Sequence, residues 1–287
     1  MLTPCDIDAT ACRNLHIFAF GTTSTCGWLS CWSQWAATMA AADHLSARDN
    51  LTYTLHVRTV ADSGSSREYM RGVKSKVLWV EQLLRKPVMG HRDDIYLFTD
   101  LDVVPFAPLW PLVREHLKDH EMVFMEEKHS HKGGLGGWMV NSGFYACRLT
   151  RNVRLFFQYW AVMLKGNRRL KDQDAANYLL NKQEAQVVQR QQQETAGGSS
   201  RGAAQQLRWA TFPSHLVTGN LSRISSETVA YHAVGIPSAA CGLGCSKTAR
   251  LREAFRRRNA HGGESLAGSA EFCDPEQRCQ GKNANRT

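Results

Sequence analysis

The stretch Ile95-Tyr96-Leu97-Phe98-Thr99-Asp100-Leu101-Asp102 leads from four apolar residues directly into a pair of aspartates. A short apolar run of this kind predicts a buried strand. Side chains two positions apart in an extended segment point to the same side, so Asp100 and Asp102 can face one site. Two carboxylates at the open carboxyl edge of a sheet can hold a divalent cation, although surface-facing aspartates at a strand end are also common. The stretch therefore predicts a strand and, beyond it, a candidate cation site.

The segments on either side of this strand alternate between strand and helix patterns. Short apolar or alternating runs predict strands at residues 15–20, 51–60, 122–125 and 143–147. Apolar residues at helical spacing, including Trp28, Trp32, Trp35 and Met39, predict helices at about 28–39, 73–84 and 153–164. Alternation of strands and helices predicts an α/β fold with a mixed, mostly parallel sheet flanked by helices.

Length and composition fit one large domain with a sizeable core. The chain has 287 residues, of which 43% are apolar and 21% charged, which excludes a disordered or collagen-like protein. We expect an N-terminal tail (1–14), a main domain (15–237) with a flexible glutamine-rich insertion (183–206), and a loosely packed Cys- and Arg-rich extension (238–287). No apolar run approaches the ~20 residues that cross a bilayer, and neither a secretory signal nor an anchor is seen.

Charge and cysteine content suggest partners and a compartment. The formal net charge of +9 favours anionic partners such as nucleic acid, an acidic membrane surface or a phosphate-bearing substrate. Nine cysteines are an odd number for complete internal pairing; disulfides in an oxidising compartment are one interpretation, and the late spacings Cys241-x3-Cys245 and Cys273-x5-Cys279 differ from the C-x2-C of most zinc ribbons. Glycosylation sequons at Asn50, Asn220 and Asn285 give weak support to a secretory setting.

Three further motifs carry polar side chains at turns. Asn141-Ser142-Gly143-Phe144-Tyr145 offers neutral donors and acceptors suited to sugar hydroxyls, or is simply a turn before a strand. Lys171-Asp172-Gln173-Asp174 opens a helix, where acidic residues are also favoured by the helix dipole. Tyr231-His232-Ala233-Val234-Gly235 holds a histidine before a glycine turn, and such a histidine is often structural.

Taken in this order, the four motifs resemble the nucleotide-diphospho-sugar transferase family, which are glycosyltransferases of the GT-A fold. The likeness covers about residues 15–237 without the glutamine-rich insertion. It implies a GT-A-like, Rossmann-like sheet. It also implies transfer of a sugar from a nucleoside-diphosphate-sugar to a hydroxyl acceptor on a glycan or glycoprotein, with Mn²⁺ (or Mg²⁺) as cofactor.

The resemblance also implies roles for the polar residues of the motifs. Asp100 and Asp102 match the family's metal-binding pair, with Asp100 also at the donor, and His232 matches the late histidine that completes the coordination. Asp172 and Gln173 match the catalytic pair beside the reacting anomeric carbon.

Four other residues match the family's donor-binding positions. Gly21 and Thr22, at the end of the first strand, sit where the nucleotide base and ribose bind. Asn141 matches a residue of the donor-sugar pocket. Lys76 is the expected phosphate contact, with Lys74 as a competitor for that role.

Two other functions remain open at this stage. Asp100-Leu101-Asp102-Val103-Val104 also resembles the nucleophile motif of haloacid-dehalogenase-type phosphatases, in which Asp100 would attack phosphorus. The net charge of +9 and eight tryptophans are compatible with a basic nucleic-acid-binding protein, although no nucleic-acid-binding motif accompanies them. By resemblance we expect no nucleic-acid partner, and a Golgi or secretory-pathway lumen as the location.

Overall fold

A six-stranded sheet forms the centre of the computed structural model, which describes residues 13–22, 26–46, 51–60, 66–85, 94–127, 140–195, 206–233 and 243–262. The strand order is β2-β1-β3-β6-β5-β7. The strands are β1 (Arg13–Thr22), β2 (Leu51–Val60), β3 (Ile95–Asp100), β5 (Met122–Glu126), β6 (Val140–Arg148) and β7 (Trp209–Phe212). The pairs β1–β2, β1–β3 and β5–β7 are parallel, whereas β6 runs antiparallel to both β3 and β5. The expected mixed, mostly parallel sheet is confirmed.

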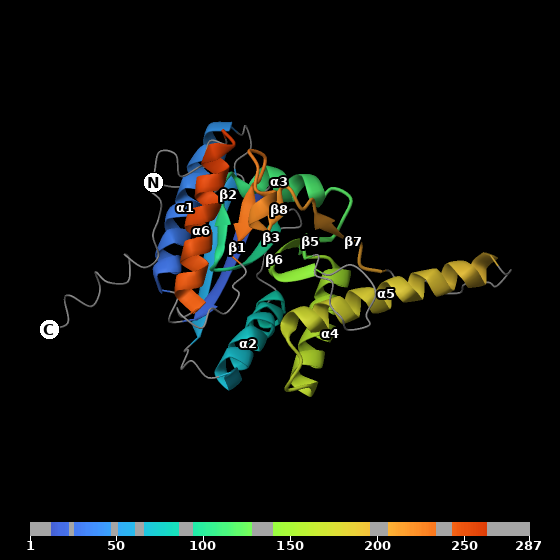
Figure 1. The fold of residues 1–287 in the computed structure, drawn as a ribbon. Helices are drawn as coiled ribbons and strands as arrows, with labels where there is room; N and C mark the ends of the chain where they lie inside the picture. Colours follow the sequence, from blue (N-terminus) through green and yellow to red (C-terminus); the bar gives the residue numbers. More distant parts are fainter. Residues whose placement is uncertain are drawn as a thin grey trace, which may run out of the picture.

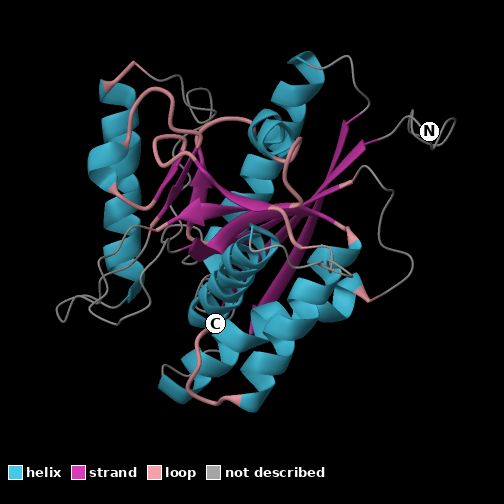
Figure 2. Cartoon of the chain, turned by 90° about the vertical axis from the view of Figure 1, so that its right-hand side faces the viewer, coloured by secondary structure: helices cyan, strands magenta, loops and turns pink. Residues whose placement is uncertain are grey.

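Helices cover both faces of this sheet (Figures 1 and 2). The alternation along β1 shows why, because Leu15, Ile17 and Ala19 join one buried cluster while Phe18 joins another. The first cluster includes residues of α1 (Cys26–Ser46), α3 (Leu109–His116) and α6 (Leu243–Ala260). The second includes residues of α2 (Ser66–Leu84), α4 (Arg151–Gly166) and α5 (Asp172–Thr195). The fold therefore has three layers, helix on sheet on helix.

A small second sheet continues from the carboxyl edge of the first. Its order is β4-β9-β8, with β4 (Val103–Pro105), β9 (Ala230–His232) and β8 (Val217–Thr218). The 3₁₀ helix η3 (Leu221–Arg223) follows β8. Only two residues separate β3 from β4, which pairs antiparallel with β9, with Val103 opposite His232. This pairing brings a histidine from late in the chain beside the aspartate pair.

Aromatic rings stack across the large sheet below the edge where β3 ends. Ring centroids lie 4.9 Å apart for Phe18 and Phe98, and 4.8 Å apart for Phe98 and Tyr145. Such pairs contribute about 0.5–1.5 kcal/mol each beyond the area they bury. Phe98 precedes Asp100 by two residues, so this packing fixes the strand that carries the aspartate.

Among the described residues, no helix has the length and apolarity to cross a membrane.

Three segments differ from the sequence prediction. Strand β1 begins at Arg13, inside the expected tail. Helix α5 continues to Thr195, so residues 183–195 are helical where a flexible insertion was expected; 196–205 lie outside the described residues. Gln, Glu, Lys, Arg and Ala are all good helix formers. The segment was nevertheless predicted to be flexible, because it lacks the apolar periodicity that indicates a packed helix. In Figure 1 this end of α5 extends away from the body of the molecule.

The third difference lies in the C-terminal extension. Residues 238–287 were expected to be loosely packed, and the basic run 250–258 within them is helical, as part of α6. However, Leu251, Ala254 and Phe255 are buried in the first cluster, so α6 belongs to the packed domain. The Arg-rich composition obscured this because the apolar residues of α6 are few. Residues 234–242 and 263–287 lie outside the described residues.

Candidate active site

Asp100, Asp102 and His232 converge at the carboxyl edge of the large sheet. One ligand atom from each lies within 4.8 Å of the others, which makes the group a candidate metal site. His232 Nε2 is 3.3 Å from Asp102 Oδ1, and both residues are buried. His232 Nδ1 is also buried and has no hydrogen-bond partner in the described part of the chain. Residues separated by some hundred and thirty positions thus meet at one point, as the cation-site prediction requires.

Backbone hydrogen bonds fix the turn that carries the two aspartates. The Leu101 N–H donates to the Phe20 carbonyl of β1 at 3.1 Å, and the Leu101 carbonyl accepts from Trp32 Nε1 of α1 at 3.1 Å. The Ala233 N–H donates to the Asp102 carbonyl at 2.9 Å. The main chain between the two carboxylates is therefore tied to β1, α1 and the end of β9.

Gly143 allows the three ligands to approach. It lies in β6, one residue from the register pair of Thr99 and Phe144. A Cβ at Gly143 would lie 2.4 Å from His232 Cε1, 2.7 Å from Asp100 Oδ2 and 2.8 Å from Asn141 Oδ1. These separations are shorter than non-bonded atoms tolerate, so only glycine fits at this position.

Lys76, from α2, links the metal-site carboxylate to the catalytic candidate. Its ammonium donates to Asp100 Oδ1 at 2.8 Å and to the Ser142 carbonyl at 3.0 Å, and it lies 3.0 Å from Asp172 Oδ2. An ammonium has three N–H donors, so these acceptors can use all of them. Burial by itself lowers the pKa of Lys76, but the two carboxylates raise it well above its usual value, so the residue stays charged.

The two candidate lysines are thereby distinguished. Lys74 Nζ donates to the carbonyls of Leu164 and Asn167, at the end of α4, and does not reach the aspartates. Lys76 is the lysine of the site. Its contacts are with two carboxylates and one main-chain carbonyl, and the predicted phosphate contact stays a prediction.

Asp172 is held from three sides at the beginning of α5. Its Oδ2 accepts from Ser142 Oγ at 2.8 Å as well as facing Lys76, and its carbonyl accepts from Trp160 Nε1 at 2.8 Å. Only 5% of the residue is exposed. Asp172 is therefore fixed relative to Asp100 through a single shared ammonium.

Asn141 and Gln173 meet at a residue that the sequence prediction missed. Glu127, directly after β5, accepts hydrogen bonds at Oε2 from Asn141 Nδ2 and Gln173 Nε2, each at 2.7 Å. The sequence around Glu127 contains no motif. Its only signal is its place after an apolar strand whose carboxyl end meets the same sheet edge.

Gly21 and Thr22 lie at the carboxyl end of β1. Phe20 is in register with Asp100 in the neighbouring parallel strand, so Gly21 follows the register position of the aspartate by one residue. The structure thus places both residues at the edge that carries the other candidates. Their contact with the nucleotide base and ribose stays a prediction.

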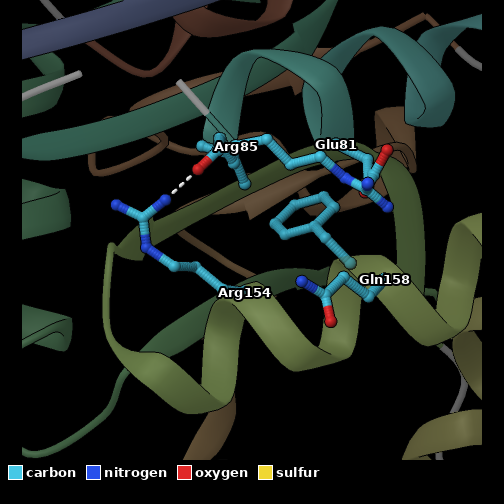
Figure 3. Close-up of a pocket in the computed structure, with 6 residues that line it drawn as sticks. Glu81, Arg85, Arg154 and Gln158 are labelled. Carbon is cyan, nitrogen blue, oxygen red and sulfur yellow. Dashed lines mark hydrogen bonds and ion pairs between the residues drawn. The ribbon is translucent and has the colours of Figure 1, made fainter. Parts of the chain in front are cut away.

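A separate pocket lies between α2 and α4 (Figure 3). Arg154 donates there to the Leu84 carbonyl, and Arg85 pairs with Glu81. None of the predicted site residues lines it. Its lining residues are Glu81, Leu84, Arg85, Arg154, Phe157 and Gln158.

The site is formally acidic in a basic chain. Among the described residues, its carboxylates are Asp100, Asp102, Asp172 and Glu127, against the one ammonium of Lys76. The local excess of negative charge suits a bound cation, which could then attract the anionic part of a substrate. The overall charge of +9 therefore does not describe the site.

The layered fold and the edge site define a glycosyltransferase of the GT-A type. A family model described as "Nucleotide-diphospho-sugar transferase" matches residues 39–239. This match spans well over half of the chain, so the chain belongs to the nucleotide-diphospho-sugar transferase family. Such an enzyme uses a sugar-nucleotide donor and an acceptor, and this replaces the phosphatase and nucleic-acid-binding alternatives.

Several solved structures are similar in fold at low sequence identity. The galactosyltransferase LgtC, solved in complex with donor and acceptor sugar analogs, is 14% identical, with a TM-score of 0.47 over 93% of this chain and 99% of that chain. GlyE of Streptococcus pneumoniae is 10% identical, with a TM-score of 0.43 over 86% and 61%. A glycosyltransferase involved in glycosylation of the major capsid of PBCV-1 is 6% identical, with a TM-score of 0.45 over 83% and 98%. No curated protein sequence matches the chain.

Proposed function

We propose that this enzyme transfers a sugar from a nucleoside-diphosphate-sugar to a hydroxyl group on a glycan or glycoprotein, with Mn²⁺ (or Mg²⁺) as cofactor. The observation that carries the proposal is the convergence of Asp100, Asp102 and His232 within 4.8 Å of one another. The lysine that contacts this group also contacts Asp172, so the cation site and the catalytic candidate form one connected unit.

The residues present fit a divalent cation. Asp100 turns Oδ1 to Lys76, while Oδ2 faces the space beside Gly143 and His232 that a Cβ would fill. Two carboxylates and one imidazole form an oxygen and nitrogen ligand set, which suits Mn²⁺. When bound, the ion supplies positive charge against the developing charge of the departing diphosphate.

The protein's own groups orient the reactants. Lys76 holds the carboxylates of Asp100 and Asp172 at a fixed separation, and so fixes the metal-binding side of the site relative to the sugar-binding side. Asp172 and Gln173 begin α5 and would lie beside the anomeric carbon. Gly21 and Thr22 would receive the nucleotide, because a parallel sheet binds ligands at the carboxyl ends of its strands.

The decisive experiment screens nucleoside-diphosphate-sugars by thermal shift with and without Mn²⁺, followed by assays of donor hydrolysis and transfer. A donor that binds only the native protein raises its melting temperature. We expect Mn²⁺-dependent release of free sugar and no action on simple phosphate monoesters. Asp102→Ala and His232→Ala should each reduce turnover by at least about 100-fold, since loss of residues that merely support metal ligands already costs about 10–100-fold.

Matched controls remove one aspartate and one histidine at exposed positions outside the site. Asp119→Ala and His261→Ala change exposed residues outside the site and should leave turnover unchanged. Far-UV circular dichroism establishes that all four variants are folded. Turnover at the level of the unsubstituted enzyme in both site variants would contradict the proposal.

We also propose that the enzyme works in the Golgi or the secretory-pathway lumen. In support, Cys31 of α1 is buried and disulfide-bonded, and disulfides persist in oxidising compartments. The sequon residue Asn220 is exposed, and its Oδ1 accepts from Ser222 Oγ at 2.9 Å. Expression in a eukaryotic secretory host should give a glycosidase-sensitive band that Asn220→Gln shifts to lower mass; a reduced, unglycosylated protein in its native cell would refute this location.

A further inference from the structure

Glu127 connects the two side-chain amides of the site. Asn141 lies on β6 and Gln173 on α5, and both donate to the same oxygen of Glu127, at 2.7 Å. Hydrogen bonds to an ionised carboxylate are shorter and roughly twice as strong as neutral ones. Glu127 is partly buried, so water competes only partly for these bonds. One residue therefore sets the rotamers of two others from different elements.

The chemistry of the partners fixes which end of each amide faces Glu127. An ionised carboxylate only accepts hydrogen bonds, whereas an amide has a donating NH₂ and an accepting oxygen. Both NH₂ groups must therefore face Glu127, and both amide oxygens must face elsewhere. Asn141 agrees with this, since its Oδ1 accepts from the Gly143 N–H at 2.6 Å.

Gln173 is left with an available oxygen. Its main-chain carbonyl accepts from Asn177 Nδ2 at 2.9 Å, and its Nε2 is bound to Glu127. Within the described ranges Gln173 Oε1 has no protein partner, and the residue is partly exposed at the first turn of α5. The side chain is thus oriented with its acceptor end free of the residues that the structure describes.

We propose that Glu127 is a positioning residue that makes Gln173 present its carbonyl oxygen, and not its NH₂ group, to the donor sugar. This inference rests on the proposed function. Positive charge develops at the anomeric carbon as a glycosidic bond breaks. An amide oxygen stabilises that charge, whereas an amide NH₂ in the same place would oppose it.

The first test observes the amides without requiring activity. In ¹H–¹⁵N spectra of the unsubstituted enzyme, the side-chain NH₂ signals of Asn141 and Gln173, assigned from Asn141→Asp and Gln173→Glu, should be shifted and slow to exchange. In Glu127→Ala both signals should move to the positions of free amides. If both signals stay where they are in Glu127→Ala, the proposal is overturned.

The second test is a double-mutant cycle between Glu127 and Gln173. Glu127→Ala should lower kcat by about 10- to 100-fold, the range expected for a small misplacement of a reacting group. The KM for the donor should rise by a smaller factor than kcat falls, since Glu127 acts on the donor through Asn141 and Gln173. In the Gln173→Ala background the same substitution should cost less than about threefold more, because residues that act through one another are non-additive.

Further variants separate positioning from folding. Glu127→Gln keeps the volume and removes the charge, so it should show the same kcat effect at smaller size, even if Glu127→Ala unfolds. Glu184→Gln, at an exposed position of α5, should change nothing. Independent, multiplying losses in the cycle would show that Glu127 has a merely structural role and would overturn the inference. If no sugar donor is turned over at all, the proposed function fails, while the amide spectra still decide whether Glu127 orients Gln173.

Discussion

Asp100 shows how much each residue of the site must do. Its Oδ1 accepts from Lys76, and its Oδ2 faces the space next to Gly143 and His232. Asp100 therefore needs the buried ammonium of Lys76 on one side and a residue without a side chain, Gly143, on the other. Neither requirement is visible in the Asp-x-Asp motif itself.

Gly143 is the residue at which this requirement is tested most directly. In Gly143→Ala, the new methyl group would lie 2.4 Å from His232 Cε1 and 2.7 Å from Asp100 Oδ2, so the ligands must move apart. We expect Mn²⁺ affinity, measured by calorimetry, to fall by at least about 10-fold, comparable to loss of support for a metal ligand. Gly166→Ala is the control, because its Cβ would meet nothing within 4 Å. Equal metal affinity in both variants would show that the site can relax around a methyl group.

Some individual residues could be predicted from the sequence and others could not. Asp100, Asp102 and His232 were predicted from motifs that follow one another along the chain in the family's order, and the structure brings them together. Lys76 and Lys74 could not be separated, because their side chains point in different directions around α2 and only packing decides which direction meets the site. Glu127 was missed because its role depends on contacts with β6 and α5, and no local pattern encodes those contacts.

At the scale of elements, α6 completes the domain through one buried arginine. Arg258 donates from Nη1 to the carbonyls of Ser225, Ser226 and Thr228, at 3.2, 2.5 and 2.6 Å. Its guanidinium also lies 5.4 Å from the ring centroid of Phe106. The segment that leads into β9, and hence to His232, is thereby anchored to α6.

Replacement of this arginine should destabilise the whole domain. Arg258→Met keeps most of the bulk but leaves carbonyls without a donor, which costs about 1–3 kcal/mol for each buried group left unsatisfied. We expect a loss of about 2–4 kcal/mol in the free energy of unfolding, measured by urea titration. The control Arg256→Met removes an exposed arginine that pairs with Glu253 at the surface, and should leave the free energy of unfolding nearly unchanged. If the two variants are equally stable, α6 does not depend on Arg258.

The elements themselves were predicted with uneven success, for identifiable reasons. Strands and helices with clear periodicity, such as β3 and α4, were confirmed. The outer part of α5 was not foreseen as helix, because helix propensity without an apolar stripe resembles a polar linker. Helix α6 was not foreseen as part of the core, because burial depends on partners such as Phe106, whose ring centroid is 5.1 Å from that of Phe255.

At the scale of the whole molecule, a second polar cluster lies toward the amino ends of β1 and β3, away from the active site. His16 Nδ1 is 3.2 Å from His56 Nε2, and His16 Nε2 is 3.2 Å from Asp94 Oδ2. Asp94 is buried and also accepts from the main-chain and side-chain nitrogens of Asn14. Burial, and then the nearby His16, lower the pKa of His56 below its ordinary value of 6.5.

This cluster should make the stability of the molecule depend on pH. Because the native state binds a proton at His56 less tightly than the unfolded chain does, the free energy of unfolding should fall as the pH drops below about 6.5. In His56→Phe this contribution disappears, so the urea midpoint should change less between about pH 7.5 and pH 5.5. His261→Phe, at an exposed position, should keep the original pH dependence. An unchanged slope in His56→Phe would contradict the assignment.

The reversed direction of β6 decides which of its residues lie next to the end of β3. Because β6 runs against β3, its first residues, and not its last, stand beside Asp100. The chain must therefore leave β5 and enter β6 at the same rim of the sheet, with Glu127 at one end of that connection and Val140 at the other. One strand orientation thus gathers polar residues from three strands at a single rim of the sheet: Asp100 of β3, Glu127 after β5 and Asn141 of β6.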